Sequence, residues 1–307
     1  ARVNINLPYR LKLVFFGSYT YNNTEDSQYL PTSVWAYGQG YRGLRSSESL
    51  LGNMMLAYNR QIGKHFIDVL ALGELSKDRY SGFYTTATNF SSDAMGFNNL
   101  QAGALRPWDG TGSYFEDPRQ VSFLGRVNYS YDDRYVLTLN ARTDASSKFG
   151  ENHKWGFFPS ASVAWNISQE DFMRYVDIVD NLKVRLGYGL AGNQGGISSY
   201  TTMNLAKPNG VTPVGNLPMV TFETLRNVNP NLKWEVKKTF NAGADLEMYG
   251  SRLILSVNYY KSKTSDMLYN YHVSVPPFTY NTLLANIGSM ENNGVEISVG
   301  GTPVRTR

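Results

Sequence analysis

The chain has 307 residues, with 22 Tyr, 28 Gly, no Cys and a formal net charge of +4. The lack of cysteine excludes a disulfide framework and a cysteine-ligated metal site. The small positive charge is spread along the chain without a basic block, so the sequence indicates no nucleic-acid-binding surface. No stretch approaches the length of about 18 apolar residues that a membrane-spanning helix needs. The negative mean hydropathy does not exclude a membrane protein, because the strands of a membrane barrel are only half apolar.

Segments that alternate apolar and polar residues recur along the chain, as expected for strands with one apolar and one polar side. The clearest is residues 252–260, where Leu255, Val257 and Tyr259 point to one side. Ser256 and Asn258 point to the other side. In chain order, the predicted strands are about Arg10–Tyr21, Leu51–Arg60, His65–Leu75, Gln120–Tyr131, Arg134–Asp144, Phe157–Ile167, Leu182–Leu190, Lys233–Met248, Arg252–Thr264 and Gly294–Gly300.

The predicted strands are long. A strand in a soluble sandwich usually has about 5–6 residues, whereas a tilted crossing of a bilayer needs about 9–11 residues. Tyrosines gather near the strand ends, where an interfacial aromatic girdle would lie. The pattern therefore predicts an all-β, antiparallel, up-and-down transmembrane β-barrel, of which this chain supplies only a part.

The connections support an up-and-down order. Gln61–Lys64, Asp132–Asp133 and Tyr249–Ser251 are short and have turn-type residues at hairpin spacing. The connections that follow the odd-numbered strands are much longer. Ser168–Met173, between the sixth and seventh strands, has a serine followed by acidic residues and predicts a short helical turn. Short turns at one end and long loops at the other are the construction of outer-membrane barrels.

The sequence shows no pattern of catalytic or metal-ligating residues. His65, His153 and His272 are far apart and have no ligand spacing. The glycine-rich segment 192–196 lacks the lysine and the following helix of a phosphate-binding loop. We therefore expect no enzymatic activity, no metal and no cofactor.

Two groups of side chains are candidates for ligand contact. Aromatic residues in the long connections could stack on sugars or contact proteins, or could pack small cores within the loops. Polar residues on the predicted strands would line the lumen and bond to a plug, to neighbouring strands or to water. The candidate aromatic residues are Trp35, Tyr41, Tyr84, Trp108, Tyr114 and Trp155, and the candidate lumen residues are Arg126, Asn140, Arg142, Arg185 and Asp245.

Several motifs resemble the SusC/RagA family of TonB-dependent outer-membrane transporters. They occur in the order and at the spacing of the family, and they cover the chain from about Gln120 to Gly300. Ala145 departs from the family pattern, because a glycine is expected in this turn. The motifs are Gly125–Tyr135, Arg142–Gly150, Lys154–Ser162, Ile167–Phe172, Asn181–Arg185, Gly192–Gln194, Tyr259–Lys261, Thr264–Leu268 and Asn286–Glu296.

The resemblance implies a barrel of about 22 strands with a plug in its lumen. The plug domain, TonB box and extra periplasmic domain of the family are not found in this sequence. We therefore expect residues 1–307 to be an internal part of the barrel domain, about ten strands of the larger wall.

The resemblance also implies a function and partners. A member of this family in the bacterial outer membrane imports glycan oligomers or peptides. It works with a SusD-like surface lipoprotein, with TonB acting through the plug, and with membrane lipid around the wall; two transporter–lipoprotein pairs can form a dimer. Two alternatives from other classes remain at this point: a passive outer-membrane porin, and a soluble β-rich carbohydrate-binding or adhesin module.

Overall fold

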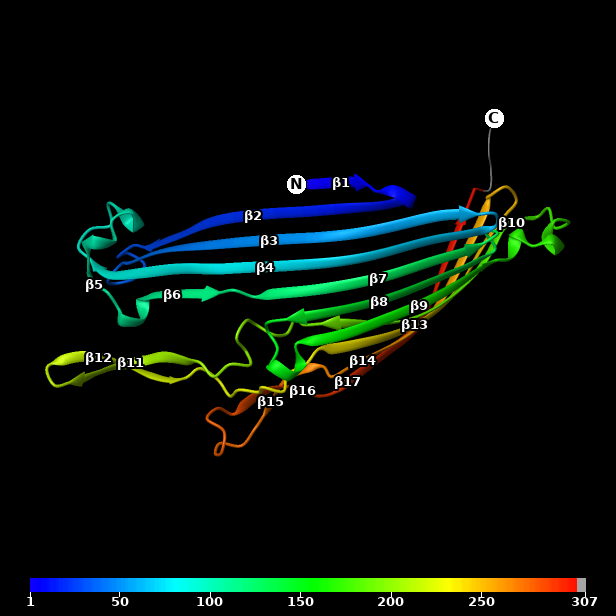
Figure 1. Ribbon diagram of the computed structural model, residues 1–307. Coiled ribbons are helices and arrows are strands. Elements are labelled where there is room, and N and C mark those ends of the chain that lie inside the picture. The colour runs from blue at the N-terminus through cyan, green and yellow to red at the C-terminus, as the bar shows by residue number, and fades with distance from the viewer. Residues whose placement is uncertain (303–307) are drawn as a thin grey trace.

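A computed structural model describes residues 1–302 and shows one large, curved antiparallel sheet (Figure 1). Neighbouring strands follow one another in the order β1-β2-β3-β4-β7-β8-β9-β10-β13-β14-β17. Within residues 1–302, β1 and β17 do not pair, so this part of the wall is open. These strands are β1 (Arg2–Asn6), β2 (Leu11–Leu30), β3 (Gln39–Ile62), β4 (His65–Phe90), β7 (Arg119–Tyr131), β8 (Tyr135–Ser146), β9 (Trp155–Asn166), β10 (Val179–Asn193), β13 (Glu235–Met248), β14 (Leu253–Ser265) and β17 (Ser289–Gly301).

Shorter elements lie in the connections. The strands β5 (Gly103–Leu105) and β6 (Thr111–Glu116) pair with the far end of β4. Two separate hairpins are formed by β11 (Ala206–Val214) with β12 (Leu217–Thr224), and by β15 (Leu268–His272) with β16 (Thr282–Asn286). The 3-10 helices are η1 (Pro8–Arg10), η2 (Gly96–Asn98), η3 (Leu100–Ala102), η4 (Trp108–Gly110), η5 (Glu151–His153), η6 (Ile167–Gln169) and η7 (Asp171–Met173).

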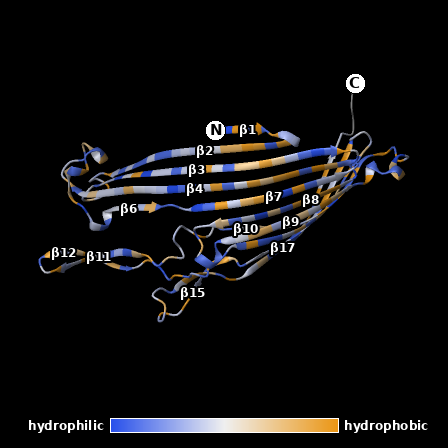
Figure 2. Cartoon of the chain, viewed as in Figure 1, coloured by the Kyte–Doolittle hydropathy of each residue, from blue (hydrophilic) through white to orange (hydrophobic). Residues whose placement is uncertain are grey.

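Hydrophobic and hydrophilic residues alternate along the strands (Figure 2), which gives the sheet an apolar side and a polar side as the sequence predicts. On β7, Phe123 and Val127 point to the apolar side and are 50% and 38% exposed. Their neighbours Arg126 and Asn128 point to the polar side, where they bond to residues of adjacent strands. Large apolar side chains left exposed along a whole sheet need a lipid environment, and the polar side then lines the lumen.

The short and long connections separate to opposite ends, which confirms the up-and-down order. The turns β3–β4, β7–β8 and β13–β14 lie at one end, together with the helical turns η6 and η7 predicted in this region (Figure 1). The loops after β2, β4, β8, β10 and β14 lie at the other end. We call these the turn end and the loop end.

The prediction was wrong about the length of the first three strands. β2, β3 and β4 have 20, 24 and 26 residues and continue well past the predicted boundaries. The connection between β2 and β3 is therefore only residues 31–38. Residues 22–28 are polar on both sides of the strand, so the alternation that marks a strand is lost although the ladder continues. The hairpins β11–β12 and β15–β16 and the strand β1 also lie outside the predicted set.

Cross-strand ion pairs support the parts of β2, β3 and β4 that extend beyond the predicted boundaries. Arg45 Nη2 lies 2.7 Å from Asp26 Oδ2, and Arg79 Nη1 lies 3.6 Å from Glu48 Oε2. Arg42 also pairs with Glu25. Opposite charges on neighbouring strands contribute modestly to pairing, and here they replace the apolar contacts of the membrane segment.

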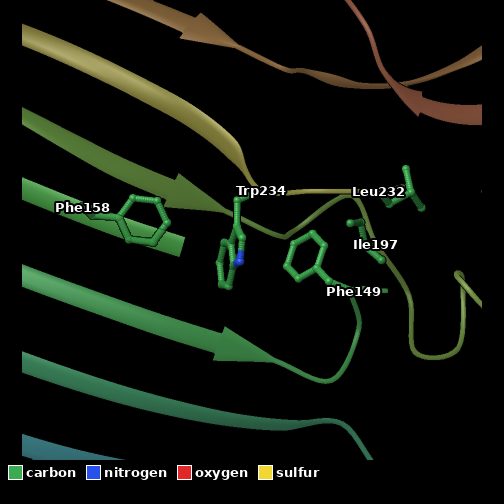
Figure 3. Packing of buried hydrophobic residues seen from close by; sticks show 5 residues of the cluster. All are labelled: Phe149, Phe158, Ile197, Leu232 and Trp234. Atoms are coloured by element: carbon green, nitrogen blue, oxygen red, sulfur yellow. The ribbon is translucent and has the colours of Figure 1, made fainter. Parts of the chain in front are cut away.

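A small apolar core lies at the loop end, between β9 and the segments that follow β8 and β10 and precede β13 (Figure 3). Phe149 packs against Trp234 with ring centroids 4.7 Å apart, and Phe158 meets the same indole edge-on at 5.6 Å. Ile197 and Leu232 complete the core and are almost completely buried. The interpretation that the loops pack cores of their own therefore holds for this region.

We expect Leu232→Ala to destabilise this core by about 2–5 kcal/mol, because Leu232 is fully buried and no neighbour can fill the space. Hydrogen exchange of the backbone amides in residues 190–236 should accelerate by about thirtyfold or more. Leu217→Ala is the matched control, because Leu217 is 69% exposed in the β11–β12 hairpin. Equal exchange in the two variants would contradict a structural role for the core.

Candidate functional site: the polar side of the wall

The middle of the polar side carries rows of hydrogen bonds that run across the strands. Arg126 Nε of β7 donates to Asn140 Oδ1 of β8 at 2.7 Å. Asn140 Nδ2 then donates to Ser160 Oγ of β9 at 3.1 Å. Long polar side chains at facing positions of three strands are thus held by one another rather than extended into the lumen.

A second group lies one step nearer the loop end. Arg142 Nε donates to both carboxylate oxygens of Asp144, at 3.0 and 2.9 Å, and Arg142 Nη2 donates to Ser122 Oγ at 3.2 Å. Asp144 is only 5% exposed. A buried carboxylate requires such a partner, because an unpaired charge would be costly to desolvate.

A third group crosses β10, β13 and β14. Arg185 Nη2 donates to Asp245 Oδ1 at 3.0 Å and to Asn258 Oδ1 at 2.9 Å. Ser256 Oγ donates to the same Asp245 oxygen at 2.8 Å. The guanidinium lies against Gly243, where an added Cβ would be 3.1 Å from Arg185 Nη2 and 2.5 Å from Asn258 Oδ1. All five predicted lumen residues therefore lie on the polar side, in three separate networks.

Three of the predicted aromatic residues come together on the polar side, beyond the apolar band toward the loop end. Tyr41 and Tyr84 stack with ring centroids 6.2 Å apart and an interplanar angle of 28°. Tyr114 of β6 lies beside them, with its ring over Gly82. An added Cβ at Gly82 would be 2.7 Å from the Tyr114 ring, so glycine is required for this close approach. We call Tyr41, Tyr84 and Tyr114 the tyrosine strip.

The other three predicted aromatic residues lie apart from the tyrosine strip. Trp35 is 52% exposed in the β2–β3 connection, and Trp108 is 51% exposed in η4. Trp155 is on the apolar side, where it stacks on Phe123 with centroids 6.4 Å apart. Phe123 belongs to the apolar band, so Trp155 is placed as a girdle residue rather than in the lumen.

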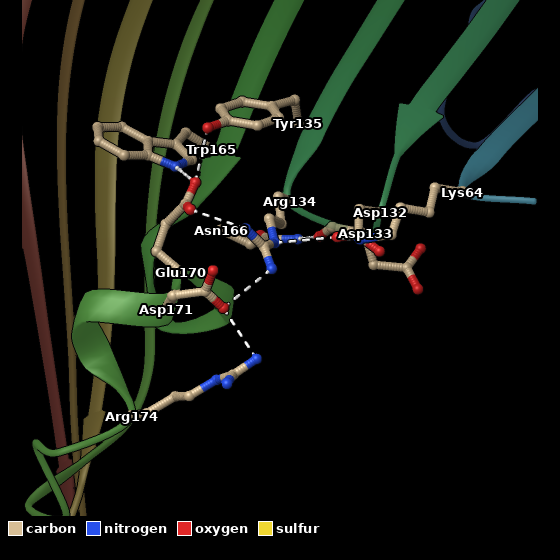
Figure 4. Close-up of polar contacts among 10 residues, drawn as sticks. All are labelled: Lys64, Asp132, Asp133, Arg134, Tyr135, Trp165, Asn166, Glu170, Asp171 and Arg174. Atoms are coloured by element: carbon tan, nitrogen blue, oxygen red, sulfur yellow. Dashed lines mark hydrogen bonds and ion pairs between the residues drawn. The ribbon is translucent and has the colours of Figure 1, made fainter.

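A polar network at the turn end connects three turns (Figure 4). Lys64 Nζ of the β3–β4 turn lies 2.7 Å from Asp132 Oδ2, and Arg134 Nε lies 3.2 Å from the same oxygen. Arg134 Nη1 donates to Glu170 Oε2 at 3.1 Å. Charged residues in turns are usually solvated. The sequence alone therefore gave no reason to expect one network from Lys64, Asp132, Arg134 and Glu170.

Glu170 also holds the aromatic girdle. The Tyr135 hydroxyl donates to Oε1 at 2.7 Å, and the Trp165 indole nitrogen donates to the same oxygen at 2.9 Å. Tyr131, Tyr135 and Trp165 stack in series along the apolar side, with centroids 6.5 and 6.3 Å apart. The side chain of one carboxylate therefore fixes the polar tips of the girdle while the rings face lipid.

These donors lower the pKa of the Glu170 carboxyl below its ordinary value of 4.5, the Tyr135 hydroxyl most and the Trp165 indole next. The folded state thus binds the Glu170 proton less tightly than the unfolded state does. The resulting stability is complete above pH 4.5 and is lost as the pH falls through the pKa of the folded protein.

We therefore expect the unfolding midpoint of the detergent-solubilised wild type to fall between about pH 6 and about pH 3 more steeply than that of Glu170→Gln. At neutral pH the variant should be less stable than wild type, because the amide has no charge to attract Arg134. Thermal unfolding followed by tryptophan fluorescence measures both. Parallel curves for the two proteins across this range would show that Glu170 does not titrate with folding.

Within residues 1–302, no three or more His, Cys, Asp or Glu side chains gather in a way that could hold a metal ion. No helix in this range is long and apolar enough to span a membrane. The polar side carries hydrogen bonds, ion pairs and stacked aromatic rings.

Comparison with known proteins places this architecture in a family. Residues 2–303 match the model described as TonB dependent receptor-like, beta-barrel. TonB-dependent receptor P3 of Formosa agariphila is 34% identical over 284 residues, which cover 90% of this chain and 28% of the relative. TonB-dependent receptor SusC of Bacteroides thetaiotaomicron is 29% identical over 295 residues, covering 92% of this chain and 28% of that protein.

The structure of the RagAB peptide importer in its closed-closed state superposes with a TM-score of 0.88 at 23% identity, covering all of this chain and 34% of that chain. This likeness shows that the fold is the same. The chain spans between about a quarter and a third of the length of these relatives. The chain therefore belongs to the TonB-dependent receptors of the SusC/RagA type and forms part of their β-barrel in the bacterial outer membrane.

Proposed function

We propose that this chain forms part of the wall of a TonB-dependent importer of glycan oligomers or peptides. The observation that carries the proposal is the two-sided wall, in which lipid-facing residues back a polar side where Arg142 and Arg185 are already paired with carboxylates. Such a surface lets a polar, hydrated solute pass without binding it tightly. The peptide class is supported by a structural neighbour that is described as a peptide importer, and the glycan class rests on the resemblance of the sequence motifs to the SusC/RagA family.

The tyrosine strip is the proposed contact for the incoming substrate. Its rings lie toward the loop end, where solute from outside would first meet the polar side. A tyrosine face can stack on a sugar ring or on a planar peptide group, and its hydroxyl can bond to either. Trp35 and Trp108 are exposed nearer the tip of the wall and would make the outermost contacts.

The rest of the receptor supplies the other parts of the mechanism. A plug outside this segment of the barrel domain would close the lumen, and TonB would pull on it from the turn end. A SusD-like lipoprotein would cover the loop end and deliver substrate, and two such pairs would form a dimer. This chain contributes part of the wall of the passage, and it carries out no catalytic step.

The porin alternative differs in its energy requirement, because a passive channel conducts without TonB. We expect bacteria that depend on this receptor for a glycan or peptide to stop taking it up when TonB is deleted, although the receptor stays in the outer membrane. Radiolabelled uptake with immunoblotting of membrane fractions measures both. Uptake that continues at the wild-type rate without TonB would favour a porin. Recovery of the receptor without detergent would favour a soluble module.

Removing one ring of the tyrosine strip should weaken capture without closing the passage. We expect Tyr84→Ala to raise the substrate concentration for half-maximal uptake by about two- to tenfold, since a lost stacking contact is worth about 0.5–1.5 kcal/mol. Tyr84→Phe should be close to wild type. Tyr188→Ala is the control, because Tyr188 is 50% exposed on the apolar side. Equal effects of the two alanine variants would remove the tyrosine strip from the substrate path.

A further inference from the structure

A cluster of lysines lies on the apolar side of the sheet, immediately beyond the apolar band toward the loop end. It consists of Lys238 on β13 and Lys261 and Lys263 on β14, all exposed. Phe240 and Tyr259 lie on the same strands, two positions nearer the turn end than Lys238 and Lys261, and meet edge-on at 6.5 Å. The cluster therefore sits where the hydrocarbon ends and the headgroups of the outer leaflet begin.

Two of these lysines oppose each other directly. Lys238 is the register partner of Lys263 in the β13–β14 ladder, and both side chains point to the apolar side. Like charges at directly opposite positions of an antiparallel pair destabilise it. A sheet that keeps this pair therefore needs a compensating negative charge nearby.

The chain supplies only one carboxylate here, and it is engaged. Glu291 on β17 is exposed and its Oε1 lies 2.6 Å from Lys261 Nζ. Glu291 is also the register partner of Lys263, whereas the register neighbours Leu190 beside Lys238 and Asn293 beside Lys261 carry no charge. Three lysines against one glutamate leave a net charge of +2 on a small exposed area.

Another pair of opposed cations in the same wall has a carboxylate of this chain beside it, which offsets the repulsion between the two positive charges. Lys77 of β4 is the register partner of Arg119 of β7, at the loop-end edge of the apolar band. There Asp117 lies between them, with its carboxylate oxygens 3.6 Å from Lys77 Nζ and 2.6 Å from Arg119 Nη2. No carboxylate of residues 1–302 is placed in this way between Lys238 and Lys263.

We propose that Lys238, Lys261 and Lys263 bind the phosphate-bearing headgroup of an anionic glycolipid in the outer leaflet. A phosphate group carries enough charge to neutralise the two opposed lysines and has several acceptor oxygens for their ammonium groups. The acyl chains of the same molecule would then lie along Phe240, Tyr259 and the apolar band below. A phosphate free in solution would have no such apolar contact, so the geometry favours the lipid.

The test uses the intact receptor, extracted from the outer membrane in detergent, and measures bound glycolipid by native mass spectrometry and by titration with purified lipopolysaccharide. We expect Lys238→Gln/Lys263→Gln to bind lipopolysaccharide about tenfold more weakly than wild type. Lys237→Gln is the matched control, because Lys237 is adjacent in sequence but points to the polar side, opposite Ala191. This control should bind like wild type.

Two further arms separate the possible outcomes. Inorganic phosphate at millimolar concentration and vesicles of zwitterionic phospholipid should not displace the glycolipid, and displacement by free phosphate would overturn the lipid assignment. Lys238→Glu should be more stable than wild type in glycolipid-free detergent, because it places an opposite charge beside Lys263. Unchanged binding by the folded double variant, or equal loss in Lys237→Gln, would overturn the proposal.

Discussion

The backbone ladder is the constraint on which the rest of this structure depends. In hydrocarbon, every N–H and C=O group must be paired by a neighbouring strand, because water cannot satisfy it. The registers between neighbouring strands from β2 to β17 provide this pairing, with one irregularity between Val179 and Asn181 at the turn end of β10, and pairing in a sheet makes successive side chains point to opposite sides. One side must then dissolve in lipid while the other faces water. The ladder itself does not depend on lipid, which is why β2, β3 and β4 continue past the membrane, where polar residues lie beside aromatic residues such as Tyr41 and Tyr84.

Charged side chains of the polar side line the passage, and several of them are bonded to neighbouring strands rather than left free in it. Arg126 and Arg185 are bound by Asn140 and Asp245 on neighbouring strands, so a solute meets groups whose hydrogen bonds are already made. Such a wall stays hydrated and repels or traps few solutes. Selectivity then has to come from shape and from surfaces such as the tyrosine strip, where the rings lie against glycine backbone and present one face.

The sequence predicted the structural features that depend on the membrane, and it did not predict the strands and hairpins that lie outside the membrane. Alternation located the strands that cross the lipid, and loop lengths gave their direction, because both follow from lipid on one side and a short turn at one end. The extension of β2–β4 and the β11–β12 hairpin lack that signal, since water surrounds both of their sides. The lumen residues were placed by strand parity alone. Trp155 looked like a loop residue, yet the register to Ala145 turns it toward Phe123 and lipid.

The turn end and the loop end of the wall differ in how their residues are connected, and each arrangement suits a different task. At the turn end, Glu170 joins Arg134, Tyr135 and Trp165, so neighbouring turns and the girdle form one connected unit. Force applied there in the proposed transporter would act on a plug held by a rigid rim. At the loop end, the loop that carries the β11–β12 hairpin extends beyond the core around Leu232, and the hairpin is exposed along most of its length. Loops of that kind can reposition around a captured substrate without disturbing the strands that keep the membrane sealed.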